Sequence, residues 1–145
     1  MRNAPSLLSM LDRPGETSRV IMPWEYVRLR RKAAGLTIEQ AARPYWCHPE
    51  HRADAERNIR RLEEPDYRLS GHFRFADMSR SFPFSVDVYR QLCLLPPHQH
   101  PALCHKCGWD EHTGQYDMNG DYVTWSRQRD GICSRCEQIA PRRER

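Results

Sequence analysis

The sequence predicts a mainly α-helical protein that ends in a small segment with a β-hairpin and four paired cysteines. Three observations lead to this prediction. Helix-forming runs fill residues 24–92, and a glycine and a threonine separate the first two runs. Prolines cluster at 96–101, and two C-x-x-C pairs follow them. We therefore divide the chain into an N-terminal arm (1–22), a helical domain (23–95), a linker (96–103), a cysteine-bearing segment (104–136) and a basic tail (137–145).

The composition allows a folded core with a large polar surface. Of the 145 residues, 39% are hydrophobic and 29% are charged, which suits one ordinary domain or two small ones. No run of about 18 apolar residues occurs, so we expect no membrane span. The N-terminus lacks a secretory signal pattern, so we expect a cytoplasmic protein. The net charge is +4, and 21 of the 23 basic residues are arginine, which suits forked contacts with phosphate and guanine. Genomic base composition can produce the same arginine bias.

The first 22 residues predict a flexible arm because they contain helix-breaking Pro14 and Gly15. As an alternative, basic arms can enter a DNA minor groove. The candidates for such contacts are Arg2, Arg13 and Arg19.

A helix, a short turn and a second helix are expected next. Proline favours a first helical turn, and Gly35 can take the left-handed conformation that ends a helix, so the first helix should span 23–34. Thr37 is a good N-cap for a second helix over 38–43, which Pro44 should stop. This pattern is the core of a helix-turn-helix, although a helical hairpin in another all-α protein is the alternative.

The first helix should bury one face and expose a basic one. We expect Trp24 and Val27 to point inward. Arg28, Arg31 and Lys32 should face solvent, either as ordinary surface charges or in contact with phosphate.

The stretch Tyr45-Trp-Cys-His-Pro-Glu-His51 contains three residue types that bind metals. Cys47, His48 and His51 lack the regular paired spacing of a strong site. We interpret the stretch instead as packing aromatics around a buried cysteine.

A third helix over 50–64, ended by Pro65, has a face suited to reading DNA. At 100° per residue its apolar residues fall on one side, where we expect Ala55, Ile59 and Leu62 to be buried. Arginine can fork onto guanine and asparagine onto adenine, so the opposite side fits a recognition helix. The residues concerned are Arg57, Asn58, Arg60 and Arg61. A solvated helix with internal ion pairs is the alternative.

Two short amphipathic segments around Phe82-Pro-Phe-Ser-Val-Asp-Val-Tyr89 complete the helical domain. Their apolar residues should form core and carry no chemistry. We place there Phe73, Phe75, Ala76, Phe82, Phe84, Val86, Val88 and Leu92, and we treat Cys93 as structural.

In this order, the stretches Gly35-Leu-Thr37, Ile59-Arg-Arg-Leu-Glu63 and Val86-Asp-Val-Tyr-Arg-Gln-Leu92 resemble the Cro/repressor-type helix-turn-helix proteins (the XRE family). The likeness covers roughly residues 24–92. It departs from the family at Ile38, where a phosphate-contacting glutamine is common, and in the longer stretch 43–55.

The resemblance implies a five-helix fold and a sequence-specific transcriptional regulator that binds double-stranded DNA, usually as a dimer on a palindromic operator. The third helix would lie in the major groove. The implied DNA-contacting residues are Arg57, Asn58, Arg60 and Arg61, with Arg31, Lys32, Thr37 and Gln40 beside them.

The clearest chemical signal is the pair of motifs Cys104-His-Lys-Cys107 and Cys133-Ser-Arg-Cys136. Each motif presents two thiolates on a tight knuckle, and two knuckles close a tetrahedral shell that selects Zn²⁺. Without a secretory signal, six cysteines favour metal ligation over disulfides. We expect one structural zinc ion held by Cys104, Cys107, Cys133 and Cys136. Free thiols and a redox dithiol are the alternatives, although a redox C-x-x-C normally opens a helix of a βαβ unit.

The residues between the two motifs predict a hairpin, so the segment resembles a zinc ribbon. Asn119-Gly120 supplies the turn, and Tyr122-Val-Thr-Trp125 supplies a strand. The segment is near neutral to acidic, which argues against a phosphate-binding surface. Its aromatics exceed what a small core needs, so some are candidates for a protein-binding face or a base-stacking platform: Trp109, Tyr116, Tyr122 and Trp125. We expect Cys133→Ser to unfold this segment and to spare the helices.

Two functions from different classes follow. The first is the DNA-binding regulator, with the zinc ribbon free to mediate a homodimer or to bind a protein partner. The second is an adaptor, such as an antitoxin or a factor that docks on RNA polymerase. We expect no enzymatic activity and no catalytic residues, because the sequence has no His-Asn-His cluster, no glycine-rich phosphate loop and no nucleophile with a matched base.

Overall fold

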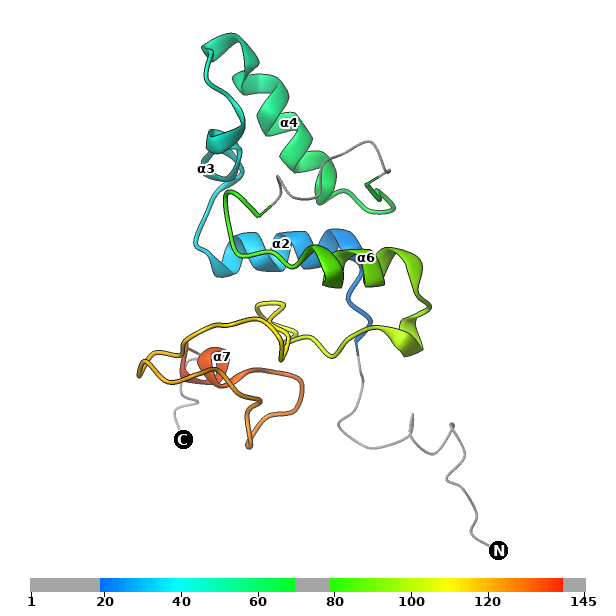
Figure 1. The fold of residues 1–145 in the computed structure, drawn as a ribbon, viewed down its shortest axis with the longest axis vertical. Coiled ribbons are helices and arrows are strands. Elements are labelled where there is room, and N and C mark those ends of the chain that lie inside the picture. Colours follow the sequence, from blue (N-terminus) through cyan, green and yellow to red (C-terminus); the bar gives the residue numbers. More distant parts are fainter. Residues whose placement is uncertain (1–18, 70–78, 140–145) are drawn as a thin grey trace, which may run out of the picture.

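The computed structural model describes residues 19–69 and 79–139, and this part of the chain is mainly helical, as predicted. Two helices lie side by side at the centre, a helical pair rises on one side of them, and the cysteine module (residues 104–139) lies on the other side (Figure 1). The central pair is α2 (Pro23–Ala33) and α6 (Val86–Leu94), the raised pair is α3 (Ile38–Ala42) and α4 (Arg52–Leu62), and the module ends in α7 (Ser134–Ile139).

Some predictions fall outside the described residues. Among them are most of the N-terminal arm, most of the basic tail, and the core residues Phe73, Phe75 and Ala76. Within 19–69 and 79–139, no helix combines the length and the apolar character needed to cross a bilayer.

Helix α2 begins at Pro23 as predicted and has Ala34 as its C-cap. Gly35 follows with a φ of 72°, the left-handed conformation expected of it. Val27 is fully buried as predicted, whereas Trp24 is only half-buried and lies under the Arg68 guanidinium. The fully covered aromatic of this helix is Tyr26 instead, because its ring packs against Phe84 and its hydroxyl accepts from the Ser85 amide.

The turn between α2 and α3 is fixed by reciprocal hydrogen bonds, so the predicted N-cap is confirmed. The Thr37 hydroxyl accepts from the Gln40 amide at 3.2 Å, and the Gln40 side chain accepts from the Thr37 amide at 2.9 Å. Ala41 and Ala42 are both completely buried. Their small side chains let α3 approach α4 closely.

The connection from α3 to α4 is longer and more helical than predicted. Pro44 does not stop the chain abruptly but sits in a 3₁₀ turn, Arg43–Tyr45. A second 3₁₀ turn, Pro49–His51, leads directly into α4. Helix α4 then buries Ala55, Ile59 and Leu62, as the 100° periodicity predicted.

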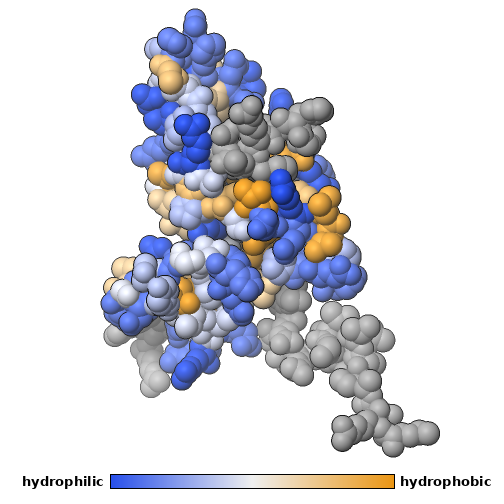
Figure 2. Space-filling model, in the orientation of Figure 1, coloured by the Kyte–Doolittle hydropathy of each residue, from blue (hydrophilic) through white to orange (hydrophobic). Residues whose placement is uncertain are grey.

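Aromatic side chains join the helices into one core. Phe84 contacts Phe82, Tyr26 and Tyr89, with ring centroids 5.1–6.1 Å apart. The hydroxyl of Tyr89 accepts from the Leu69 amide, and burial raises the pKa of Tyr26 to about 12. In Figure 2 hydrophobic side chains gather at the level of α2 and α6, while the raised pair and the module present mostly polar surface.

Candidate functional site

Four cysteines from the two predicted knuckles meet in the cysteine module. The Sγ atoms of Cys104 and Cys136 are 3.7 Å apart, as are those of Cys107 and Cys133. All four sulfurs lie within 4.8 Å of one another. A tetrahedral site with metal–sulfur bonds of about 2.3 Å has sulfur–sulfur edges of about 3.8 Å. The group is therefore compatible with binding one metal ion.

Backbone hydrogen bonds shape each knuckle around its sulfurs. In the first knuckle, the Cys104 carbonyl accepts from the Gly108 amide and the Cys104 amide donates to the Trp109 carbonyl, both at 2.8 Å. The Cys133 amide points at the Cys104 sulfur at 3.3 Å, and the Cys136 amide at the Cys133 sulfur at 3.5 Å. Amides directed at sulfur favour the thiolate form, which is the form that binds metals.

The thiols also share protons with one another. Hydrogen bonding from the Cys107 thiol, and then from Cys133, lowers the pKa of Cys104. The same sharing raises the pKa of Cys107 and Cys136, chiefly through Cys104. A bound metal ion would take the place of these protons and hold the four sulfurs together.

Apolar side chains enclose the four-cysteine group. Trp109 is only 3% exposed and packs edge-on against Trp125, with ring centroids 5.0 Å apart. Val123 and Ile132 complete the enclosure. The predicted hairpin is reduced to one antiparallel bridge, Tyr116–Tyr122, and a second bridge joins Trp125 to Cys133. Tyr116 and Tyr122 remain exposed.

A buried arginine connects the cysteine module to the helices. Arg30 of α2 is 3% exposed. Its guanidinium donates to the carbonyls of Pro83 and Cys107, both at 3.0 Å, and to the Gln115 side chain at 3.3 Å. Gly108 lies directly against this arginine with a φ of 75°, and an added Cβ would be 3.1 Å from the Arg30 Cδ. The metal knuckle is thus packed tightly onto α2.

Sequence reasoning missed Arg30, although a signal was present. Arg30 follows Tyr26 by four residues and Val27 by three, so it lies on the buried face of α2. From the sequence, outward positions were predicted for Arg28, Arg31 and Lys32, and no role was predicted for Arg30.

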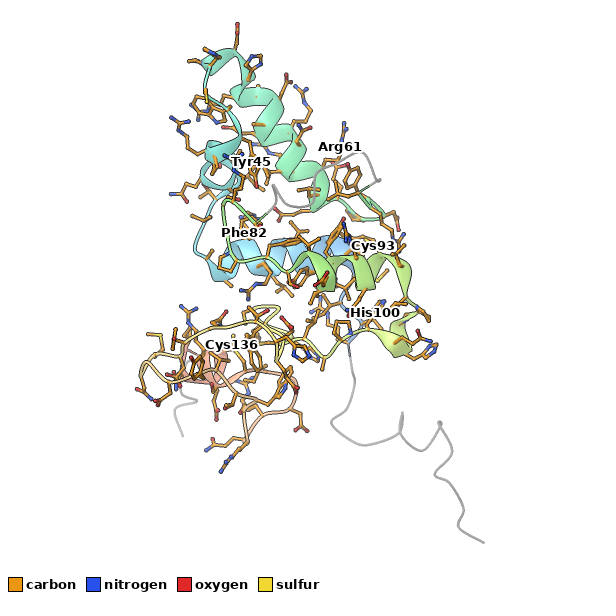
Figure 3. The ribbon with its side chains drawn as sticks, in the orientation of Figure 1. Tyr45, Arg61, Phe82, Cys93, His100 and Cys136 are labelled. Atoms are coloured by element: carbon orange, nitrogen blue, oxygen red, sulfur yellow. The ribbon has the colours of Figure 1, made fainter. Side chains whose placement is uncertain are left out.

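The predicted linker is ordered and partly packed. Pro97–Gln99 forms a 3₁₀ turn, and the His100 ring lies 2.7 Å from the Leu95 carbonyl (Figure 3). Leu103, at the end of the segment, is 6% exposed and belongs to the core of the helices. The chain therefore enters the cysteine module from a buried anchor.

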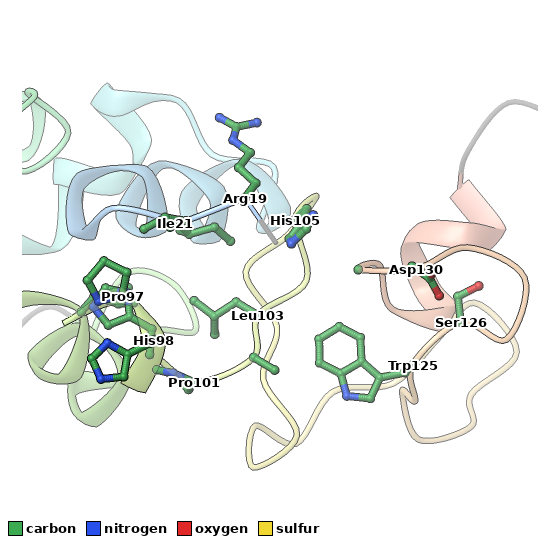
Figure 4. A pocket seen from close by; sticks show the side chains of 15 residues that line it. Arg19, Ile21, Pro97, His98, Pro101, Leu103, His105, Trp125, Ser126 and Asp130 are labelled. Carbon is green, nitrogen blue, oxygen red and sulfur yellow. The ribbon is translucent and has the colours of Figure 1, made fainter. Parts of the chain in front are cut away.

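A cleft of about 720 Å³ separates the two parts beside this anchor. Ile21 and Leu103 form one wall, Trp125 and Asp130 face them, and His105 lies at the edge (Figure 4). The helices and the cysteine module are therefore in contact at Arg30 and are separated at the cleft.

The outer face of α4 presents the predicted basic residues to solvent. Arg57, Asn58, Arg60 and Arg61 are all exposed. Arg57 pairs with Asp54 at 3.0 Å and Arg60 with Glu39 at 3.2 Å. Surface pairs of this kind are weak, so the guanidinium groups can exchange these partners for others.

The prediction that Arg31 faces solvent is wrong. Arg31 is 9% exposed, and its guanidinium forks onto the Glu63 carboxylate at 2.7 and 2.8 Å. It also donates to the Leu36 carbonyl at 2.8 Å. The fork ties the end of α4 to α2 and commits Nε, Nη1 and Nη2 of Arg31 to acceptors within the fold.

The other predicted residues near the turn are exposed. Lys32 and Arg28 face solvent as expected. Thr37 and Gln40 are also exposed, but the Thr37 hydroxyl and the Gln40 side-chain oxygen accept the hydrogen bonds that cap α3.

Arg31→Ala should lower the free energy of unfolding by about 3 kcal/mol, because it leaves a buried carboxylate unpaired. Arg28→Ala removes an exposed arginine from the same helix and should change the free energy by less than about 0.5 kcal/mol. Urea unfolding followed by tryptophan fluorescence measures both. Equal, small effects of the two substitutions would contradict the buried fork.

Cys47, His48 and His51 do not form a second metal site. Within the described ranges, the side chains that lie close enough together to hold a metal ion are those of the four cysteines in the cysteine module. The interpretation of Cys47 as buried is wrong, because Cys47 is exposed. Its neighbour Trp46 is half-buried, with the Arg43 guanidinium 4.1 Å from its ring centroid.

Four protein sulfurs would complete a tetrahedral shell, leaving no position for an activated water molecule. The site therefore suits a structural role for the metal. No protein-family model, curated protein or solved structure matches this chain.

Proposed function

We propose that this protein is a sequence-specific transcriptional regulator that binds double-stranded DNA through α4 and holds one structural Zn²⁺ ion. The observation that carries the proposal is the division of α4 into two faces. Ala55, Ile59 and Leu62 are buried against the rest of the fold, while Arg57, Arg60 and Arg61 are exposed on the opposite face and Asn58 is exposed at its edge. These side chains have the donor geometry to read base edges in a major groove.

The charge distribution supports this role for the helical part. Residues 104–139 contain four basic and six acidic side chains, whereas the helical domain, residues 23–95, contains 13 basic and ten acidic ones. A basic surface attracts the phosphate backbone and places base-reading side chains in register. The helical part therefore suits DNA better than the cysteine module does.

We further propose a Cro/repressor-like arrangement in which α4 is the reading helix. This moves the helix-turn-helix from residues 23–43, where the sequence pattern placed it, to α3 and α4. The packing of α3 against α4, with Ala41 and Ala42 of α3 completely buried, supports it. The connection Arg43–His51 is longer than the short turn of an ordinary helix-turn-helix. It lies at the far end of the pair from α2, so it leaves the exposed face of α4 uncovered (Figure 1).

We propose that the four cysteines bind zinc and that the cysteine module is a zinc ribbon. Four thiolates in a tetrahedral shell suit Zn²⁺ better than magnesium or calcium, which prefer oxygen ligands. The sulfur–sulfur distances of 3.7 Å support an ion of this size.

Replacing Arg57 and Arg61 together with alanine should abolish sequence-specific DNA binding. Each bidentate base contact contributes about 1–3 kcal/mol, so the loss of two should weaken binding roughly 30-fold or more. The measurement is selection of random double-stranded oligonucleotides by the zinc-loaded protein at fixed salt, followed by fluorescence anisotropy on the selected site.

The matched control is Arg127→Ala with Arg129→Ala, which removes two exposed arginines from the cysteine module. This control should keep full affinity, and both double variants should keep wild-type metal content and helical circular dichroism. If no sequence is enriched, or if the two double variants bind equally well, α4 does not read DNA.

An adaptor that binds other proteins is the second candidate function. The observation that favours it is the exposure of Tyr116 and Tyr122, since large exposed aromatics are typical of protein interfaces. The two functions are compatible, because the cysteine module and α4 lie on opposite sides of α2 and α6 (Figure 1).

A further inference from the structure

Four large apolar side chains lie exposed near the hairpin turn and the end of α7. Tyr116 is 59% exposed, Met118 64%, Tyr122 71% and Ile139 57%. We call these four residues the tyrosine patch. Tyrosine and methionine are enriched at the centres of protein interfaces, where they supply contact area.

The patch is held rigidly before any partner binds. Tyr116 and Tyr122 face each other across an antiparallel bridge, and their rings stack with centroids 5.1 Å apart at an angle of 27°. Asp117 fixes the turn because its carboxylate accepts from the amides of Asn119 and Asp121. A preformed surface loses little conformational entropy on binding.

Helix α7 is joined to this turn by hydrogen bonds. The Gln138 side chain donates to the Asp117 carboxylate at 3.1 Å and accepts from the Met118 amide at 2.8 Å. Ile139 follows Gln138 directly, so these hydrogen bonds bring Met118 and Ile139 to the same end of the module.

The charges around the patch select the kind of partner. Among the described residues, Asp117, Asp121 and Glu137 lie within two positions of its members, and the nearest basic residue in the sequence is Arg135 of α7, four positions from Ile139. A divalent ion held by four thiolates would make the module more negative still. A nucleic-acid strand stacking on the tyrosines would bring phosphates toward carboxylates, and a second copy docking through the same patch would oppose like charges.

We propose that the tyrosine patch binds an arginine-bearing segment of a partner protein. A guanidinium stacks favourably on an aromatic ring, and the exposed Asp121, next to Tyr122 in the sequence, supplies a carboxylate for it. The apolar stem of the arginine packs on Met118 and Ile139. This surface belongs to the cysteine module alone, so the proposal does not depend on DNA binding by α4.

The test is fluorescence anisotropy of a labelled peptide of alternating arginine and glycine, titrated with the full zinc-loaded chain. The peptide should bind, and the same peptide with citrulline in place of arginine should not. Tyr122→Ala and Tyr116→Ala should each weaken binding about tenfold, as expected for the loss of an aromatic anchor. Asp121→Asn should weaken it less and reduce its salt dependence.

Leu94→Ala is the matched control, because Leu94 is an apolar side chain on α6 that is 79% exposed. It should bind the peptide like the wild type. A second measurement on the wild-type protein guards against misfolded variants: the peptide should shift the amide NMR signals of Met118, Tyr122 and Ile139 and leave those of α4 unchanged.

Three results would overturn the proposal. Equal binding by the Tyr122→Ala and Leu94→Ala variants would place the peptide elsewhere. Binding of a single-stranded oligonucleotide that shifts the same amide signals would make the patch a base-stacking platform. If the protein self-associates in sedimentation experiments and Tyr122→Ala abolishes this association, the tyrosine patch binds a second copy of the chain.

Discussion

Cys133→Ser should release the metal ion and unfold residues 104–139. Serine removes one of four thiolates, and structural zinc in a small module supplies about 10–16 kcal/mol of apparent binding free energy at neutral pH. The apolar residues around the site, chiefly Trp109, Val123 and Ile132, form too small a core to replace that contribution. Metal content by atomic emission and dispersion of the module's amide NMR signals measure the effect.

The same substitution should also weaken the helices, which the sequence alone did not predict. Unfolding of the module removes two of the three acceptors of the buried Arg30 guanidinium, the Cys107 carbonyl and the Gln115 side chain. Unfolding of the module also releases the chain that follows Leu103, a residue buried in the core of the helices. The helical circular dichroism should persist but melt at a lower temperature.

Cys47→Ser is the matched control, because Cys47 is exposed and outside the metal site. It should leave both the metal content and the melting temperature unchanged. A Cys133→Ser protein whose helices melt like those of the control would show that the two parts are independent units.

Arg30→Met should lower the free energy of unfolding of the zinc-loaded protein by about 5 kcal/mol, since each hydrogen bond from a charged group contributes about 1.5–3 kcal/mol and three are lost. Methionine keeps much of the side-chain volume, so the effect isolates the polar junction. Urea unfolding at saturating zinc measures it.

Arg28→Met, on the exposed side of the same helix, controls for the loss of one positive charge. It should change the free energy of unfolding by less than about 0.5 kcal/mol. Similar values for the two substitutions would contradict the junction seen at Arg30.

The local features of the fold could be read from neighbouring residues. Gly35 and the Thr37–Gln40 capping box mark the turn between α2 and α3, because these effects depend on backbone groups within a few positions. The buried face of α4 follows from helical periodicity in the same way. The spacing of the cysteines likewise predicted which four side chains would meet.

The sequence could not distinguish the roles of the arginines. Arg31 was predicted to face solvent, yet it is buried against Glu63, while Arg61 of α4 is exposed. A guanidinium can be buried only where acceptors satisfy it, and those acceptors come from distant parts of the chain. Glu63 lies 32 positions from Arg31, and Cys107 lies 77 positions from Arg30.

The sequence by itself therefore determined the helix caps, the two faces of α4 and the four cysteines of the metal site. Each of these depends on local periodicity or on the spacing of a motif. Only the tertiary structure decided that Arg30 and Arg31 are buried and hydrogen-bonded to distant parts of the chain. It also decided that Leu103 packs into the core of the helices and that Tyr116 and Tyr122 remain exposed. Such outcomes depend on which distant groups come together to satisfy a charge or to exclude water.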